Sequence, residues 1–157
     1  MNNNQISPNT TDTDSNCHEL VSMVVANQLV GIPVGTVRDI LGPQRITRVP
    51  LSSSEVAGVL NLRGRIVTAI DLCRRLGIQS NNEPDEPGMS IVVEHDGELY
   101  SLLIDQVGEV LHATNEQLVK DTASLSNSWR EIADGIFRLE DRLLVLLDVG
   151  RVLDFDS

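Results

Sequence analysis

Aromatic residues are scarce in this chain of 157 residues, making up only 3% of it, with a single Trp at position 129. Hydrophobic residues nevertheless reach 41% against 22% charged residues, so aliphatic side chains must supply the core. The length suits one domain of ordinary size or two small barrels that share a core, and it excludes a large multidomain enzyme.

Cysteine is also scarce. The chain has only Cys17 and Cys73, and no Cys-x-x-Cys spacing that would indicate zinc or a redox pair. A reducing compartment fits this usage best. The amino terminus lacks the basic start and apolar stretch of a signal peptide. No apolar run approaches the roughly 20 residues that cross a bilayer. We therefore expect a cytoplasmic protein without direct membrane insertion.

Basic residues are outnumbered, with 12 Lys and Arg against 23 Asp and Glu, for a net charge of −11. This balance opposes binding to nucleic acid. The charge is uneven, because residues 19–78 carry a net +3 and residues 79–157 a net −12. Halves of opposite sign could pair head to tail with related molecules. Solvated surface charge without such a role is the other interpretation.

Catalytic and metal-binding patterns are missing too. His18, His95 and His112 do not have the spacing of a helical metal site. The sequence has no nucleophile elbow and no glycine-rich phosphate or dinucleotide loop. Asp71 and Asp148 could be imagined as an acid and base pair, but their equivalent places in a repeat favour a structural role. We expect no enzyme activity, no cofactor and no metal.

Two polar stretches divide the chain. Residues 1–18 contain too little apolar surface to offset the entropy of ordering them, which predicts a disordered tail. Residues 79–89 combine two prolines with acidic residues, which predicts a linker. The folded domain is then 19–157, with barrel one at about 19–78 and barrel two at about 90–154.

The two halves resemble each other. Residues 58–76 align with 135–153, and residues 30–41 match 100–111 in pattern. The first alignment contains six identical pairs, Gly58/Gly135, Leu62/Leu139, Arg65/Arg142, Asp71/Asp148, Arg74/Arg151 and Leu76/Leu153. The chain is therefore interpreted as one unit used twice.

Apolar patterns predict short strands in each half. The expected strands cover 20–26, 29–41, 66–70, 90–94, 99–111 and 143–147. Gly64 and Asp141 tolerate the positive φ of a hairpin tip, and Asp71 and Asp148 are placed to N-cap short helices. A mainly β fold of two five-stranded barrels packed together, with short helices, accounts for this pattern better than a flat open sheet.

The segment Asn61-Leu62-Arg63-Gly64-Arg65-Ile66-Val67, followed by Asp71-Leu72, resembles the Asn-x-Arg-Gly…Asp-Leu signature of the CheW-like domain of bacterial chemotaxis. Residues 34–40 and 103–110 are similar to two further segments of that family, and the likeness covers about residues 19–154. It implies two SH3-like five-stranded barrels, with Asn61 and Gly64 as structural hairpin residues.

The resemblance implies a non-enzymatic adaptor that couples chemoreceptors, the methyl-accepting chemotaxis proteins, to the histidine kinase CheA. In the family, a groove between the barrels holds the helical cytoplasmic tip of the receptor. The matching receptor-binding positions are Val37, Asp39, Arg63, Val107 and Val110. Aliphatic floor positions and rim charges suit a helix in a groove. Valines in a barrel core and an arginine at a solvated hairpin tip are the alternative interpretations.

The resemblance also implies contact with the CheW-like regulatory domain of the kinase and with other CheW-like proteins in rings, at receptor arrays on the inner face of the membrane. Two positions depart from the family, which usually has Glu where Asp39 stands and Pro where Thr68 stands. A CheW-like scaffold of a non-flagellar chemosensory pathway, with surface motility, development or a cyclic dinucleotide as its output, is the alternative function.

Overall fold

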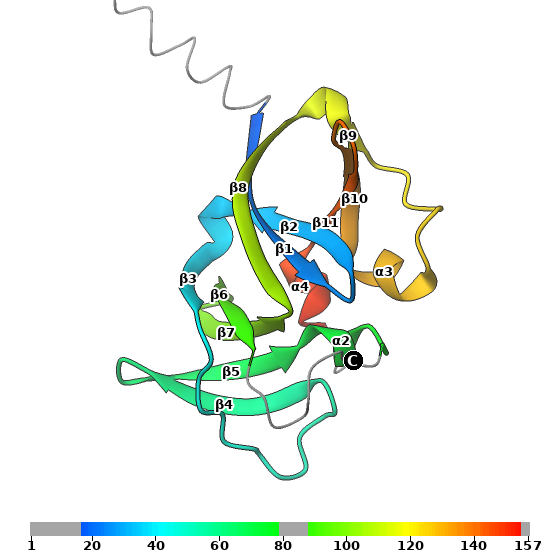
Figure 1. Ribbon diagram of the computed structural model, residues 1–157. Helices are drawn as coiled ribbons and strands as arrows, with labels where there is room; N and C mark the ends of the chain where they lie inside the picture. Colours follow the sequence, from blue (N-terminus) through cyan, green and yellow to red (C-terminus); the bar gives the residue numbers. More distant parts are fainter. Residues whose placement is uncertain (1–16, 79–87, 155–157) are drawn as a thin grey trace, which may run out of the picture.

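The computed structural model describes residues 17–78 and 88–154, which form eleven strands and several short helices (Figure 1). The strands are β1 (Cys17–Val25), β2 (Gln28–Pro33), β3 (Val37–Leu41), β4 (Val56–Leu62), β5 (Arg65–Asp71), β6 (Met89–His95), β7 (Glu98–Ile104), β8 (Gln106–Thr114), β9 (Leu118–Val119), β10 (Ala133–Arg138) and β11 (Leu143–Leu147). The helices are η1 (Val34–Thr36), α2 (Leu72–Arg75), η2 (Asn115–Gln117), α3 (Asn127–Ile132) and α4 (Val149–Val152).

The strands form two sheets, and each sheet takes strands from both halves of the chain. Sheet A has the order β8-β1-β2-β11-β10-β9, and sheet B has the order β3-β6-β7-β5-β4. The prediction of one contiguous barrel at about 19–78 and another at about 90–154 is therefore wrong. The closing strands join the halves, because β11 pairs in parallel with β2 and β5 pairs in parallel with β7. The two halves thus exchange strands reciprocally.

The exchange occurs where the predicted long strands break. Residues 29–41 divide at η1, just after Pro33, whose missing N–H cannot continue a strand ladder. Residues 99–111 divide at Asp105, whose backbone N–H donates to the Val24 carbonyl at 3.0 Å. The Asp105 carboxylate accepts the Ala26 N–H at 2.9 Å. Both breaks carry the chain from one sheet to the other, at equivalent places in the repeat.

Each sheet curls around an apolar interior to form a small barrel. The sheet A interior includes Leu20 and Phe137, and the sheet B interior includes Leu41 and Leu60, which lie on opposite edge strands. A third cluster joins the two barrels. Its buried members come from both sheets and include Met23, Ile32, Ile91, Leu102 and Val145. The mainly β fold with two packed barrels is confirmed, although sheet A gains a sixth strand of two residues.

The repeat positions have identifiable structural roles. Asp71 N-caps α2 by accepting the Arg74 N–H at 3.2 Å, and Asp148 N-caps α4 by accepting the Arg151 N–H at 3.3 Å. Strands β4 and β10 each contain a bulge at the paired glycines Gly58 and Gly135. The expectation of a positive φ at Asp141 is wrong, because the second hairpin turns over four residues closed by a bond from Leu139 N–H to the Arg142 carbonyl.

The described ranges adjust the predicted boundaries. The predicted disordered tail, 1–18, lies outside the described residues up to position 16, but Cys17 and His18 belong to β1. Residues 79–87 of the predicted linker, 79–89, also lie outside the described residues, and Met89 begins β6.

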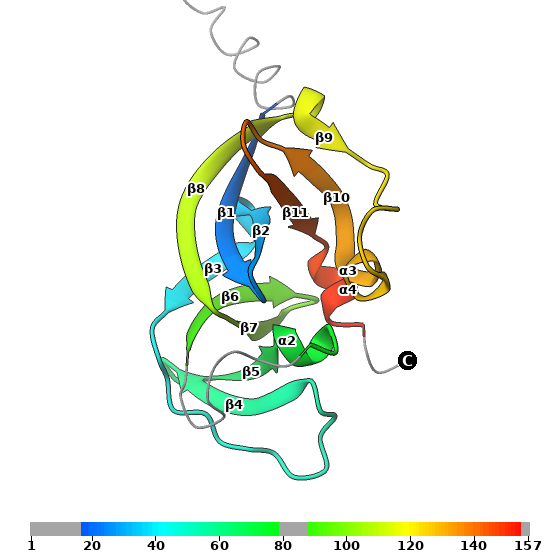
Figure 2. The same ribbon diagram turned by 45° about the vertical axis from the view of Figure 1, so that its right-hand side comes forward.

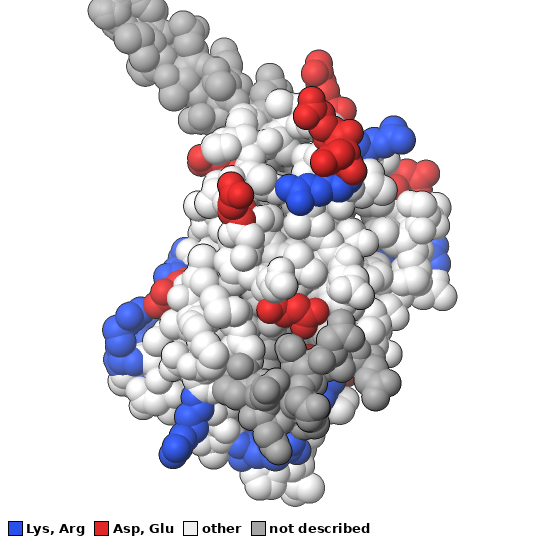
Figure 3. All heavy atoms as spheres, in the orientation of Figure 1, with Lys and Arg blue, Asp and Glu red and all other residues white. Residues whose placement is uncertain are grey.

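Strand exchange also redistributes the charge. Within the described residues, the barrel of sheet B (34–78 and 88–105) has seven basic and seven acidic residues. The barrel of sheet A (17–33 and 106–154) has five basic and ten acidic residues. The contrast of +3 against −12 between chain halves therefore becomes a contrast of 0 against −5 between barrels. On the face shown in Figure 3, Lys and Arg dominate the lower end and Asp and Glu the upper end.

Candidate functional site

The β4–β5 hairpin positions Arg63. Arg63 and Gly64 form its two-residue tip with φ values of 53° and 86°, the backbone of a type I′ turn. The Asn61 side-chain oxygen accepts the Gly64 N–H at 2.9 Å and holds this tip. The turn therefore points Arg63 outward, and its side chain is 73% exposed.

Arg63 forms an ion pair with Asp39 of β3. Strands β3 and β4 are the opposite edges of sheet B, so this pair spans the line along which the barrel closes. Such an exposed pair contributes only about 0–1 kcal/mol to stability. Both charges therefore remain available to a partner at little free-energy cost.

Val37 begins β3 and is half-buried against the cluster between the barrels. The exposed side chains next to it on β3 are Arg38, which pairs with Glu94 at 3.0 Å, and Ile40, which is 42% exposed. Edge strand β3 thus combines aliphatic and charged side chains, and Ile40 is an exposed apolar position that the sequence interpretation missed.

Val107 and Val110 lie on β8, the long edge strand of sheet A. In the register of β8 against β1, Val107 faces Met23 and Val110 faces Val21. Val107 packs against the same cluster between the barrels as Val37, whereas Val110 is 50% exposed. The interpretation of these valines as barrel core therefore fits Val107 and Val37 in part, and it does not fit Val110.

The five predicted positions fall into two groups. Val37 and Asp39 lie on edge strand β3 of sheet B, where Arg63 of the β4–β5 hairpin joins them through its ion pair with Asp39. Val107 and Val110 lie on one edge strand of sheet A. Strand β8 contacts β6, which is the neighbour of β3 in sheet B. Figures 1 and 2 both place β3 and the lower part of β8 on the same side of the molecule. The groups therefore flank the seam between the two barrels.

Among the described residues, no group of three or more His, Cys, Asp or Glu side chains could hold a metal ion. No helix in the described ranges is long and apolar enough to span a membrane. Burial and the neighbouring Glu98 raise the pKa of the Tyr100 phenol on β7. Two interlocked barrels with a mixed apolar and charged seam define a protein-binding module.

Comparison with known proteins identifies the module. Residues 19–156 match the model of the CheW-like domain family. The chemotaxis protein CheW of Thermotoga maritima is 29% identical over 137 residues, 87% of each chain. The chemotaxis protein CheW of Klebsiella aerogenes is 30% identical over 139 residues, 88% of this chain and 83% of that protein.

The fold agrees with a solved structure. The scaffolding protein TtCheW of Thermoanaerobacter tengcongensis superposes with a TM-score of 0.79 over 88% of this chain and 94% of that chain, at 24% identity. The chain belongs to the CheW-like domain family. Like that family, it is a non-enzymatic adaptor of bacterial chemotaxis signal transduction that couples chemoreceptors to the histidine kinase CheA.

Proposed function

We propose that the seam between the barrels binds the helical cytoplasmic tip of a chemoreceptor. Val37, Asp39 and Arg63 form one side of this surface, and Val107 and Val110 form the other. The observation that carries the proposal is that Val37 and Val107, from different sheets, pack against the same cluster between the barrels. An amphipathic helix laid along this seam would meet apolar side chains flanked by charges.

We further propose that the chain binds the CheW-like regulatory domain of a CheA-type kinase and that it also joins rings with other CheW-like proteins. The pseudo-symmetric barrels support this, because the internal repeat relates the order β8-β1-β2-β11-β10 of sheet A to the order β3-β6-β7-β5-β4 of sheet B. A related two-barrel domain can therefore meet equivalent strands on either barrel. The protein would then work in the cytoplasm, at receptor arrays on the inner face of the membrane. The two CheW relatives described above are chemotaxis proteins, which favours this pathway over a non-flagellar one.

The test measures binding of a receptor cytoplasmic fragment to the native chain and to Arg63→Glu and Val37→Asp. We expect both substitutions to weaken binding, because one reverses a rim charge and the other places a carboxylate on the apolar side. Arg65→Glu is the matched control, since Arg65 is an exposed arginine on the same hairpin, two residues from Arg63. Circular dichroism verifies that each variant is folded.

A charge exchange separates the receptor contact from a merely structural ion pair. The double variant Asp39→Arg, Arg63→Asp restores opposite charges at the same two positions. If the pair only supports the hairpin, the exchange recovers receptor binding. We expect it to remain weak, because a partner that recognises the individual charges now meets them inverted. Full recovery of receptor binding by the double variant would overturn the assignment of Asp39 and Arg63 to the receptor contact. Equal weakening of receptor binding by Arg63→Glu and Arg65→Glu would overturn it as well.

A further inference from the structure

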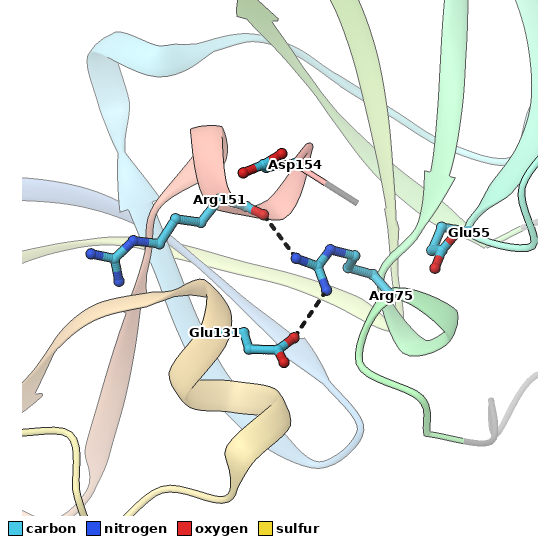
Figure 4. Close-up of a pocket in the computed structure, with 5 residues that line it drawn as sticks. All are labelled: Glu55, Arg75, Glu131, Arg151 and Asp154. Atoms are coloured by element: carbon cyan, nitrogen blue, oxygen red, sulfur yellow. Dashed lines mark hydrogen bonds and ion pairs between the residues drawn. The ribbon is translucent and has the colours of Figure 1, made fainter. Parts of the chain in front are cut away.

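Arg75 at the end of α2 behaves differently from its neighbour Arg74. The Arg75 side chain is only 10% exposed, whereas that of Arg74 is 43% exposed. Arg74 stays within the barrel of sheet B, where it pairs with the Asp71 cap at 3.7 Å. Figure 4 shows the Arg75 side chain reaching across to α3 and α4, which follow strands of sheet A.

The Arg75 guanidinium donates to the end of α4. Its Nε donates to the Val152 carbonyl at 2.8 Å, and its Nη2 donates to the Arg151 carbonyl at 2.9 Å. Its Nη1 lies 3.5 Å from the Glu131 carboxylate of α3. Carbonyls in the last turn of a helix have no N–H partner four residues further along the helix, and a planar cation matches a pair of them well. The Arg151 carbonyl also accepts the Asp154 N–H at 3.2 Å. One side chain thus ties the barrel of sheet B to two elements of the other barrel.

This tie breaks the internal symmetry of the molecule. In the repeat, Arg74 corresponds to Arg151, and both pair with the aspartate that caps their own helix. Arg75 corresponds to Val152, which is buried and apolar. The contact that Arg75 makes between the barrels therefore has no counterpart at the equivalent position of the second repeat.

Arg75 gives the two barrels a directional contact in addition to the hydrogen bonds that Asp105 forms with Val24 and Ala26 where the chain crosses between the sheets. An open polar cavity of about 400 Å³ lies beside the Arg75 contact, lined by Glu55, Arg75, Glu131, Arg151 and Asp154. Side chains therefore do not fill this part of the contact between the barrels. The apolar cluster behind it holds the barrels together without a strong directional preference, whereas paired hydrogen bonds from a guanidinium fix an orientation.

We propose that Arg75 is a positioning residue that sets the angle between the two barrels. In Figure 2, strands β3 and β8 lie at the left of the molecule, whereas α3 and α4 lie at the right. A change in the angle at Arg75 therefore changes the spacing of the two edges of the seam. The consequence for receptor binding rests on the proposed function, but the effect on the angle does not.

The test measures the distance between spin labels in the two barrels by double electron–electron resonance. Labels at Arg65→Cys in sheet B and Glu116→Cys in η2 of the other barrel, in a Cys17→Ser chain that keeps the buried Cys73, report the angle without any partner. We expect Arg75→Met to broaden or shift the distance distribution, because it keeps the aliphatic stem and removes every donor. Arg74→Met, from the same helix, should match the native distribution.

The conservative variant Arg75→Lys keeps the charge but cannot donate as a planar fork, so its distribution should lie between those of the native and Arg75→Met chains. If Arg75→Met does not fold, the distance distribution of Arg75→Lys is compared with that of the native chain instead. A native-like distribution in both Arg75 variants, or equal broadening in Arg74→Met, would overturn the proposal. Receptor-fragment binding should fall in Arg75→Met and recover in part in Arg75→Lys. Absence of receptor binding by the native chain would instead contradict the proposed function and leave the distance result valid.

Discussion

Ser101 on the central strand β7 is fully buried, and its hydroxyl has no hydrogen-bond partner among the described residues. A buried hydroxyl without a partner lowers stability by about 1–3 kcal/mol relative to one that is satisfied. We predict that Ser101→Ala raises the free energy of unfolding by about 1 kcal/mol, because it removes the polar group without opening a large cavity. Urea unfolding followed by the fluorescence of Trp129 measures the change.

Ser22 on β1 is the matched contrast. It is equally buried, but its hydroxyl donates to the Glu109 carbonyl at 2.6 Å. Ser22→Ala should therefore lower the free energy of unfolding by about 1 kcal/mol. Destabilisation by both substitutions would contradict this description of Ser101.

Several single residues could be predicted from the sequence because their roles depend on local chemistry. The Asp71 and Asp148 caps need only an acceptor at the start of a helix, and the Arg63-Gly64 tip needs only a short turn with positive φ. Asp141 was misjudged, since a residue that tolerates positive φ is not required to adopt it when the turn is longer. The direction of Arg75 could not be predicted, because its acceptors are 76 and 77 positions away in the chain.

At the scale of the element, the bulge in β4 explains the first of the repeated glycines. A Cβ on Gly58 would lie 2.3 Å from the Thr47 carbonyl oxygen, and φ is +151°. Thr47 pairs with Val59 through two backbone hydrogen bonds of 2.8 Å. Gly58 therefore allows the loop after β3 to pack against β4.

We predict that Gly58→Ala destabilises the fold by about 2 kcal/mol or more, because the backbone of Thr47 must move. Gly35→Ala is the control, since a Cβ there would meet no atom within 4 Å. Its effect should stay within about 0.5 kcal/mol. Thermal or urea unfolding distinguishes the two, and an equal effect at both positions would contradict the role assigned to the bulge.

Strand positions were largely predictable, but strand ends were not. Apolar alternation located most of the strands, because it reflects the burial of one face. It could not show that 29–41 and 99–111 each divide, since the apolar pattern continues through both breaks while the chain passes from one barrel to the other.

For the whole molecule, the exchange of strands is the feature that local patterns could not predict. The internal repeat indicated two similar units, and contiguous units were the simplest interpretation. The parallel pairs β2–β11 and β5–β7 join residues from opposite halves instead. Such pairing depends on the cluster between the barrels, to which both halves contribute. The same exchange reduces the charge contrast, from +3 against −12 between the chain halves to 0 against −5 between the barrels.

Strand exchange makes a direct prediction about fragments. The fragment 1–78 contains β1 and β2 without β8 and β11, and it contains β3 to β5 without β6 and β7. Neither this fragment nor 79–157 should show a cooperative unfolding transition alone, because each leaves both sheets incomplete. An equimolar mixture should recover native circular dichroism and a cooperative transition. Independent cooperative folding of either fragment would contradict the exchanged topology.

The central claim is that this chain physically couples a receptor to a kinase. The most direct measurement immobilises a receptor cytoplasmic fragment and determines how much CheA-type kinase it captures with and without the native chain. We predict that the chain increases kinase capture, that folded Arg63→Glu reduces the increase, and that Arg65→Glu leaves it nearly unchanged. Capture that does not depend on the chain, or a native chain that binds neither partner, would contradict the account.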